Sequence, residues 1–189
     1  MEADWEVEIG PGAPVIDVQW SGFVDLRSRP QAARELPEAG DLPELAEALA
    51  RLNGTASPVW TSKCDVWQIL DAESFDVYEM EASPESAQYA WACYIDLLPQ
   101  SSQPQSAKRW ASPDTAISWC RTVCKQLHDV ALRNCRADLV IRNAITSPEF
   151  TDMGITAYLT SCGPTRQEAY RVLGSVLLSF ADALCHLQR

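Results

Sequence analysis

Three side chains able to bind a metal follow one another at intervals of four residues. Cys120, Cys124 and His128 have the spacing that aligns residues along one side of a helix. Thiolates and imidazole are good ligands for soft metals, and Cys135 follows closely enough to supply a fourth ligand. The same helix has an apolar stripe that takes in the cysteines, buried free cysteine behaves as a small hydrophobe, and the sequence lacks a Cys-x-x-Cys pair. We therefore expect core residues here, and neither a metal nor another cofactor.

Cys162 is the second residue with candidate chemistry. It ends an expected strand directly before Gly163, Pro164 and the start of a helix at Thr165. A thiol near a helix N-terminus has its pKa lowered by the helix dipole, which favours the nucleophilic thiolate. Neither histidine can be assigned to it as a base from the sequence, so a thiol-dependent enzyme that uses Cys162 is kept only as an alternative. The chain shows no glycine-rich phosphate loop, Gly-x-Ser-x-Gly elbow or His-Glu-x-x-His motif, which makes an enzyme the less favoured class.

Alternating apolar residues, or runs rich in β-branched and aromatic residues, predict the strands that would position these side chains. The expected strands are residues 15–26, 59–70, 89–99, 137–145 and 153–163, with a short edge strand at 75–80. Helix starts are indicated at Asp41, Ser112 and Thr165, each with a capping side chain, and the first two are followed by proline in the first turn. These helices are expected to continue to residues 53, 132 and 187.

The resulting order, β-α-β-β-α-β-β-α, predicts one α+β domain over residues 1–189. We expect a mixed or antiparallel sheet of about five strands with about three helices on one face. A ferredoxin-like core with an added strand and helix is the specific expectation. A doubly wound parallel sheet is disfavoured because the strands alternate instead of being apolar throughout. Residues 1–14 are expected to be a loose N-terminal segment, and exposed loops are expected at 27–40, 71–88 and 99–112.

The negative charge is confined to the first half of the chain. Residues 1–90 contain 18 Asp and Glu against 5 Lys and Arg, whereas residues 91–189 contain 8 against 10. Such acidity disfavours nucleic acid as a partner and allows a basic protein partner, although plain solubility is the favoured explanation of the charge itself. The start of the sequence lacks a secretory signal, and no apolar run is long enough for a bilayer, so we expect a cytoplasmic protein with no membrane contact and with reduced cysteines.

One face of the expected sheet collects polar and aromatic side chains. If the helices cover the other face, strand alternation leaves this set open: Asp17, Gln19, Ser21, Thr61, Lys63, Asp65, Trp67, Tyr94, Asp96, Asp138, Arg142, Thr156, Tyr158 and Thr160. Aromatic residues mixed with both charges are typical of recognition surfaces, but a solvated face with cross-strand pairs has the same composition.

The sequence favours a non-enzymatic interaction or accessory protein of the cytoplasm. It would use the acidic N-terminal half and the open sheet face to bind a protein partner. A small-molecule-binding regulatory domain is the first alternative, and it rests only on what sheets of this kind often do. The thiol enzyme is the second alternative.

Overall fold

Six strands form one sheet in the computed structural model of the chain, which describes all residues except 11, 18–21, 71–74, 101–109, 148–149 and 188–189. The strands are β1 (Glu2–Val7), β2 (Val15–Ile16), β3 (Val59–Ile69), β4 (Tyr89–Pro99), β5 (Cys135–Ser147) and β6 (Phe150–Gly163). The antiparallel hairpins β3–β4 and β5–β6 are joined by antiparallel pairing of β4 with β6. β1 and β2 both pair parallel with the outer edge of β5, so the mixed sheet has the order β1-β5-β6-β4-β3.

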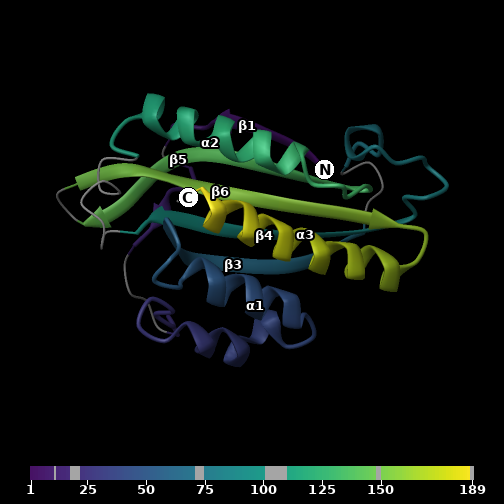
Figure 1. Cartoon of the computed structure of the whole chain (residues 1–189), viewed down its shortest axis with the longest axis horizontal. Helices are drawn as coiled ribbons and strands as arrows, with labels where there is room; N and C mark the ends of the chain where they lie inside the picture. Colours follow the sequence, from purple (N-terminus) through teal and green to yellow (C-terminus); the bar gives the residue numbers. More distant parts are fainter. Residues whose placement is uncertain (11, 18–21, 71–74, 101–109, 148–149, 188–189) are drawn as a thin grey trace.

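Three helices lie across one face of this sheet (Figure 1). They are α1 (Pro43–Leu52), α2 (Pro113–His128) and α3 (Arg166–His186). Their buried residues share one core with the alternate β4 side chains Cys93, Ile95 and Leu97. The predicted α+β class and the helices on one face are therefore confirmed. Among the described residues, none of the helices combines the length and apolar character needed to cross a bilayer.

Helix starts follow the capping pattern at two of the three expected positions. Ser112 forms a reciprocal capping box with Thr115, and the Thr165 hydroxyl accepts a hydrogen bond from the Glu168 N–H. α1 differs, because its N-cap is Leu42 and makes no side-chain cap. The predicted Asp41 cap is wrong. Pro43, whose fixed φ suits the first turn, opens this helix instead.

The N-terminal region is more ordered than expected. Residues 1–14 are not loose throughout, because β1 pairs with β5 over Glu2–Val7. The strand predicted over 15–26 is reduced to Val15–Ile16 in the described residues, and residues 22–26 lie outside any strand. There Asp25 accepts hydrogen bonds from the backbone and side chain of Arg27, a local turn that competes with strand pairing.

The three predicted exposed loops all contain buried residues. Residues 27–40 form the short helices η1 (Pro30–Glu35) and η2 (Pro37–Ala39), in which Ala32, Ala33 and Ala39 are buried. The predicted edge strand 75–80 is instead the helical turn η4 (Tyr78–Met80), which buries Met80. Near residue 110, the Trp110 ring is buried with its centroid 4.9 Å from that of Trp119. These segments contribute apolar packing that local composition did not reveal.

Candidate functional site

The sheet face opposite the helices is covered at both ends and uncovered between them. Each cover is a small cluster of buried apolar residues. One cluster contains Met80, Ala87, Ala90 and Cys162, and the other contains Val15, Trp60, Leu98 and Ala144. The strand positions between the two clusters carry polar and aromatic side chains.

One row of register partners crosses all five long strands in this open part. Its members, from β1 to β3, are Asp4, Asp138, Tyr158, Tyr94 and Asp65. Register partners project from the same face of a sheet, so two tyrosines lie between three carboxylates. Both end members, Asp4 and Asp65, are exposed.

Three aromatic rings form a continuous strip along this row. The ring centroids of Trp67 and Tyr94 are 6.3 Å apart, and those of Tyr94 and Tyr158 are also 6.3 Å apart. The Arg142 guanidinium extends the strip, since its central carbon lies 5.7 Å from the Tyr158 centroid. Trp67 is 37% exposed, so part of its ring is open to a partner. The strip offers the aromatic and arginine chemistry of binding hot spots.

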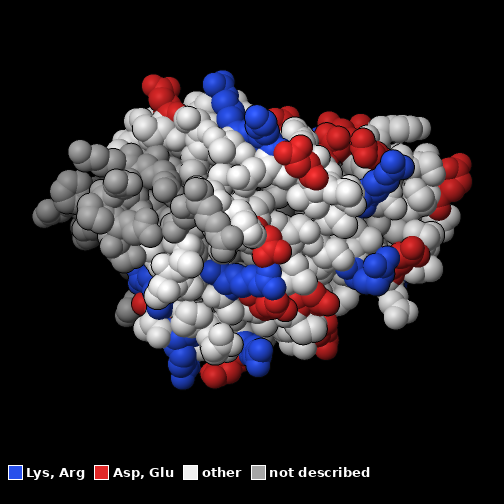
Figure 2. Space-filling model, in the orientation of Figure 1, with Lys and Arg blue, Asp and Glu red and all other residues white. Residues whose placement is uncertain are grey.

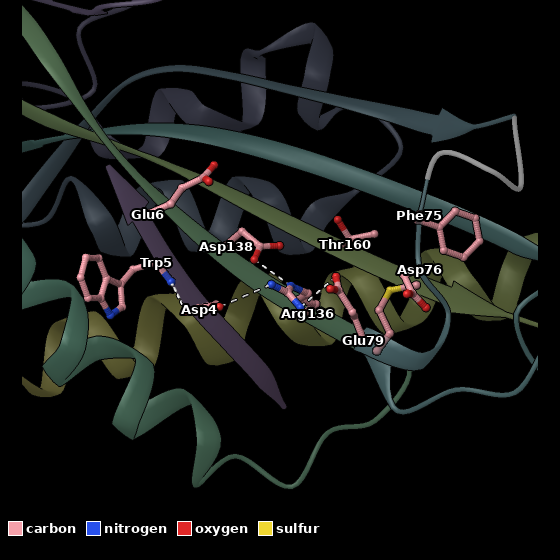
Figure 3. A pocket seen from close by; sticks show the side chains of 10 residues that line it. Asp4, Trp5, Glu6, Phe75, Asp76, Glu79, Arg136, Asp138 and Thr160 are labelled. Atoms are coloured by element: carbon pink, nitrogen blue, oxygen red, sulfur yellow. Dashed lines mark hydrogen bonds and ion pairs between the residues drawn. The ribbon is translucent and has the colours of Figure 1, made fainter. Parts of the chain in front are cut away.

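An acidic cavity of about 400 Å³ lies at the β1 side of the row (Figure 3). Around a single arginine, Arg136, its walls carry the carboxylates of Asp4, Glu6, Asp76, Glu79 and Asp138. The Arg136 guanidinium is 2.7 Å from the Asp138 carboxylate, 3.0 Å from that of Glu79 and 3.9 Å from that of Asp4. Burial raises the pKa of Asp138, although its hydrogen bond from Arg136 opposes the shift.

The helix-covered face has a different charge pattern. In its described part, Lys and Arg lie close to Asp and Glu at several places, without one extended region of either sign (Figure 2). The acidic cavity instead gathers five carboxylates around one guanidinium on the opposite face. This difference makes the open face the part of the described surface best suited to a basic group.

A second cavity, of about 340 Å³, lies where β3, β4, β5 and β6 pass beneath residues 12–16. It is lined by Gly12, Ala13, Pro14, Ile16, Lys63, Tyr94, Asp96, Arg142, Thr156 and Tyr158. Asp96 is only 7% exposed, and its Oδ1 accepts a hydrogen bond from the Thr156 hydroxyl at 2.6 Å. Burial raises the pKa of Asp96 despite this hydrogen bond and the nearby charges of Lys63 and Arg142.

Other groups of the second cavity are held by neighbouring side chains. Burial, helped by the charges of Asp96 and Asp65, raises the pKa of Tyr94 to about 12, so its phenol is protonated at neutral pH. Arg142 donates two hydrogen bonds to Glu8 Oε2, at 2.6 and 3.1 Å from its Nη2 and Nε. The cavity thus combines a buried carboxylate, two cations and two phenols.

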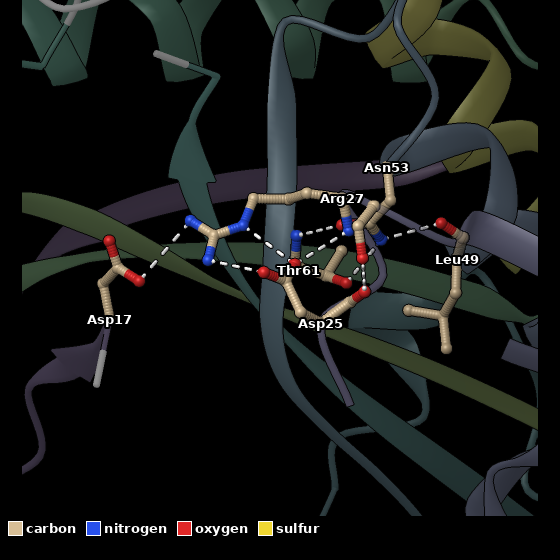
Figure 4. A network of polar contacts seen from close by, with 7 residues as sticks. Asp17, Asp25, Arg27, Leu49, Asn53 and Thr61 are labelled. Carbon is tan, nitrogen blue, oxygen red and sulfur yellow. Dashed lines mark hydrogen bonds and ion pairs between the residues drawn. The ribbon is translucent and has the colours of Figure 1, made fainter. Parts of the chain in front are cut away.

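Most residues predicted for the open face lie on it, with exceptions at β3 and near residue 20. A register shift between Thr61 and Lys63 turns Thr61 toward the helices, where its hydroxyl accepts a hydrogen bond from Asn53. The assignment of Thr61 to the open face is therefore wrong. Asp17 lies 3.6 Å from Arg27 (Figure 4). The central carbon of the Arg27 guanidinium also lies over the Trp60 ring, 4.0 Å from its centroid. Gln19 and Ser21 are outside the described residues.

Cys162 does not have the environment of an activated thiol. The side chain is fully buried in the cluster with Met80, Ala87 and Ala90. Burial raises the pKa of Cys162 to about 11, so the expected lowering by the helix dipole is wrong. Desolvation is the cause of this shift, and the thiol is protonated at neutral pH.

The residues considered for a metal take part in packing and backbone bonding. Cys120 and Cys124 are buried, and burial raises the pKa of both thiols. His128 Nε2 accepts a hydrogen bond from the Ala3 N–H at 3.3 Å, so this imidazole holds the edge strand β1. Within the described part of the chain, no three His, Cys, Asp or Glu side chains are grouped so as to hold a metal ion.

Five charged residues of the acidic cavity were missed by the sequence analysis: Asp4, Glu6, Asp76, Glu79 and Arg136. The alternation of Ala3, Trp5 and Val7 was the signal that could have placed Asp4 and Glu6 on the open side of a strand. Arg136 lies one residue before the expected start of its strand. No local pattern indicates Glu79, because only the path of the chain over the sheet brings it to Arg136.

The fold and site define an α+β protein with one sheet face covered by helices and with polar cavities on the other. No protein-family model matches the sequence, and neither a curated protein nor a solved structure matches the chain. Functional inference therefore starts from the chemistry of the open face.

Proposed function

We propose that this chain is a non-enzymatic interaction protein of the cytoplasm that binds a basic segment of a protein partner on its open sheet face. The observation that carries the proposal is the uncovered row of Asp4, Asp138, Tyr158, Tyr94 and Asp65 between two apolar covers. A partner segment laid along this row would meet carboxylates at both ends and aromatic rings in the centre.

Charge complementarity selects a basic partner. The acidic cavity holds five carboxylates against Arg136, and the N-terminal half of the chain carries most of the negative charge. A field of this sign accelerates the encounter with a positively charged segment and discourages acidic ones. The aromatic strip of Trp67, Tyr94 and Tyr158 would supply the desolvated contacts that dominate affinity.

The strand connections also suggest how the fold is related to a ferredoxin-like core. β4 and β5 are parallel and are separated by β6, and α2 connects them, which makes one split βαβ unit. We propose that this unit is the ferredoxin-like part, extended by β3 at one edge and by β1 and β2 at the other. Comparison with a structure of a natural homologue that lacks β1 and β2 would test this relation.

Binding of a lysine-rich peptide that carries a fluorescent label tests the proposed function directly. Asp4→Lys and Asp41→Lys change the charge equally, but only Asp4 belongs to the row, while Asp41 is exposed before α1. Fluorescence anisotropy should show at least about fivefold weaker binding for Asp4→Lys and a change of less than about twofold for Asp41→Lys. Equal loss in the two variants would mean that only the net charge matters, and the proposal would be wrong.

A further inference from the structure

The Asp96 carboxylate is unusually buried for an acidic group. It lies in β4, is 7% exposed and lines the second cavity. Burying an ionised group is costly, and an asparagine oxygen would accept the same hydrogen bond from Thr156. Charged groups kept at such a cost are concentrated at functional sites, so the carboxylate itself is expected to contact a ligand.

The same cavity also presents positive charge. Lys63 is the register partner of Asp96 on β3, and Arg142 projects from β5 on the other side of β6. Both side chains line the cavity, and both charges act on the Asp96 carboxylate. A ligand in this space therefore meets an anionic group and cationic groups within one small volume.

Aromatic residues and a chain segment complete the walls. The rings of Tyr94 and Tyr158 lie between the charged groups, and residues 12–16 cover the side near β2. The volume of about 340 Å³ is at the lower end of the range for small-molecule sites, which favours a compact ligand.

We propose that the second cavity binds a small zwitterion of the α-amino acid class. The ligand's ammonium group would contact the Asp96 carboxylate, and its carboxylate would face Lys63 and Arg142. The ligand's side chain would pack on the phenol rings of Tyr94 and Tyr158. This binding site goes beyond the proposed protein interaction. It shares Tyr94 and Tyr158 with the aromatic strip, but its charged groups Asp96, Lys63 and Arg142 lie outside the acidic cavity.

Calorimetry with three related probes tests both halves of the ligand. L-Phenylalanine carries both charges, 2-phenylethylamine lacks the carboxylate, and 3-phenylpropionate lacks the ammonium group. The wild-type protein should bind L-phenylalanine at least about tenfold more tightly than either analogue, because each analogue lacks one of the two charged groups that would contact the cavity. Bound L-phenylalanine should also raise the melting temperature.

Two variants test which residue of the cavity contacts each charged group of the ligand. Asp96→Asn should remove the preference for L-phenylalanine over 3-phenylpropionate, and Lys63→Gln should reduce the preference over 2-phenylethylamine. The matched controls Asp41→Asn and Lys125→Gln alter exposed side chains away from the cavity and should change affinity by less than about twofold. Circular dichroism and thermal melting verify that each variant is folded before binding is measured.

Three outcomes would overturn the zwitterion site. They are no binding of any standard amino acid at about 10 mM, equal affinity for L-phenylalanine and 2-phenylethylamine, and undiminished zwitterion binding by folded Asp96→Asn. The lysine-rich peptide experiment with Asp4→Lys is independent of these results. Failure of the zwitterion site can thus be distinguished from failure of the proposed protein interaction.

Discussion

At the scale of single residues, the buried carboxylate of Asp96 is expected to lower the stability of the fold at neutral pH. Its carboxylate is buried in β4, and the pKa is raised because burial outweighs the stabilising contacts. A folded-state pKa above the unfolded value means that the ionised form is disfavoured in the fold. Wild-type stability should therefore contain a penalty at neutral pH that is relieved as the pH falls through the raised pKa.

Asp96→Asn is expected to stabilise the protein at pH 7 by on the order of 1 kcal/mol, because the neutral amide keeps the Thr156 hydrogen bond without a buried charge. The gain should shrink between pH 7 and pH 4, because the wild-type carboxyl takes up a proton as the pH falls through its raised pKa. Urea unfolding of both proteins at the two pH values measures this difference. Destabilisation by Asp96→Asn at pH 7 would show that the charge contributes to folding.

Cys162 should be inert in the native protein. The thiol is buried beneath Met80 and Ala87, and its pKa is raised to about 11. Brief treatment with iodoacetamide at pH 7.5, followed by peptide mass mapping, should therefore modify Cys162 only after denaturation. The half-buried Cys185 provides an internal comparison in the same sample. Rapid native labelling of Cys162 would revive the alternative of a thiol enzyme.

At the scale of elements, Asn53 joins the end of α1 to the edge strand β3 (Figure 4). Its Nδ2 donates to the Leu49 carbonyl at 2.8 Å and to the Thr61 hydroxyl at 2.7 Å, while its Oδ1 accepts from the Thr61 N–H at 3.0 Å. Asn53 is 1% exposed, so water has little access to these groups. The side chain therefore replaces the missing neighbour of an edge strand at this point.

Asn53→Ala should lower the free energy of unfolding by roughly 2 kcal/mol, since the Thr61 N–H loses its acceptor in a buried position. Thr55→Ala, in the exposed loop that follows, is the control and should stay within about 0.5 kcal/mol of wild type. Chemical denaturation measures both values. A loss below about 0.5 kcal/mol for Asn53→Ala would contradict the assigned role of this side chain.

Gly154 lets β2 approach the hairpin β5–β6. A Cβ at this position would lie 2.5 Å from the Cβ of Val15, which is fully buried in its cluster. Gly154→Ala should therefore destabilise the fold by about 1–3 kcal/mol through overpacking. Gly10→Ala is the control, because an added Cβ there has no neighbour within 4 Å. Similar melting temperatures for the two variants would contradict this packing.

The central strands and helices were predictable because each carries its own signal. β4, for example, places apolar residues toward the helices at alternate positions and ends at Pro99, and α3 begins at a capping threonine. β1 was missed because its pairing partner lies about 130 residues later, and acidic side chains hide its alternation. The β-bulge near Thr61 reversed one assignment because a register shift leaves no mark in local composition.

Only part of the candidate site was predictable, because the rest depends on contacts between residues far apart in the sequence. The side chains of Lys63, Tyr94, Asp96 and Tyr158 follow from strand alternation, and the structure places them around one cavity. The acidic cavity depends on the path of residues 75–80 over the sheet and on the unexpected strand β1. Such long-range packing has no local signature.

At the scale of the whole molecule, the two faces of the sheet differ in what covers them. The helices bury one sheet face in the main core, and two apolar clusters close the ends of the other. What remains open is a row of charged and aromatic residues beside an acidic cavity. Our central claim is that this remaining surface binds a basic segment of a protein partner.

Native mass spectrometry of the protein isolated gently from its host's lysate tests this claim most directly. The comparison includes wild type, a row variant with Asp4→Lys and Asp65→Lys, and a control variant with Asp41→Lys and Glu47→Lys on the helix side. We predict a stoichiometric complex with one basic protein for wild type and the control, and a bare chain for the row variant. A bare wild-type chain, or a row variant that keeps the same partner, would contradict the account.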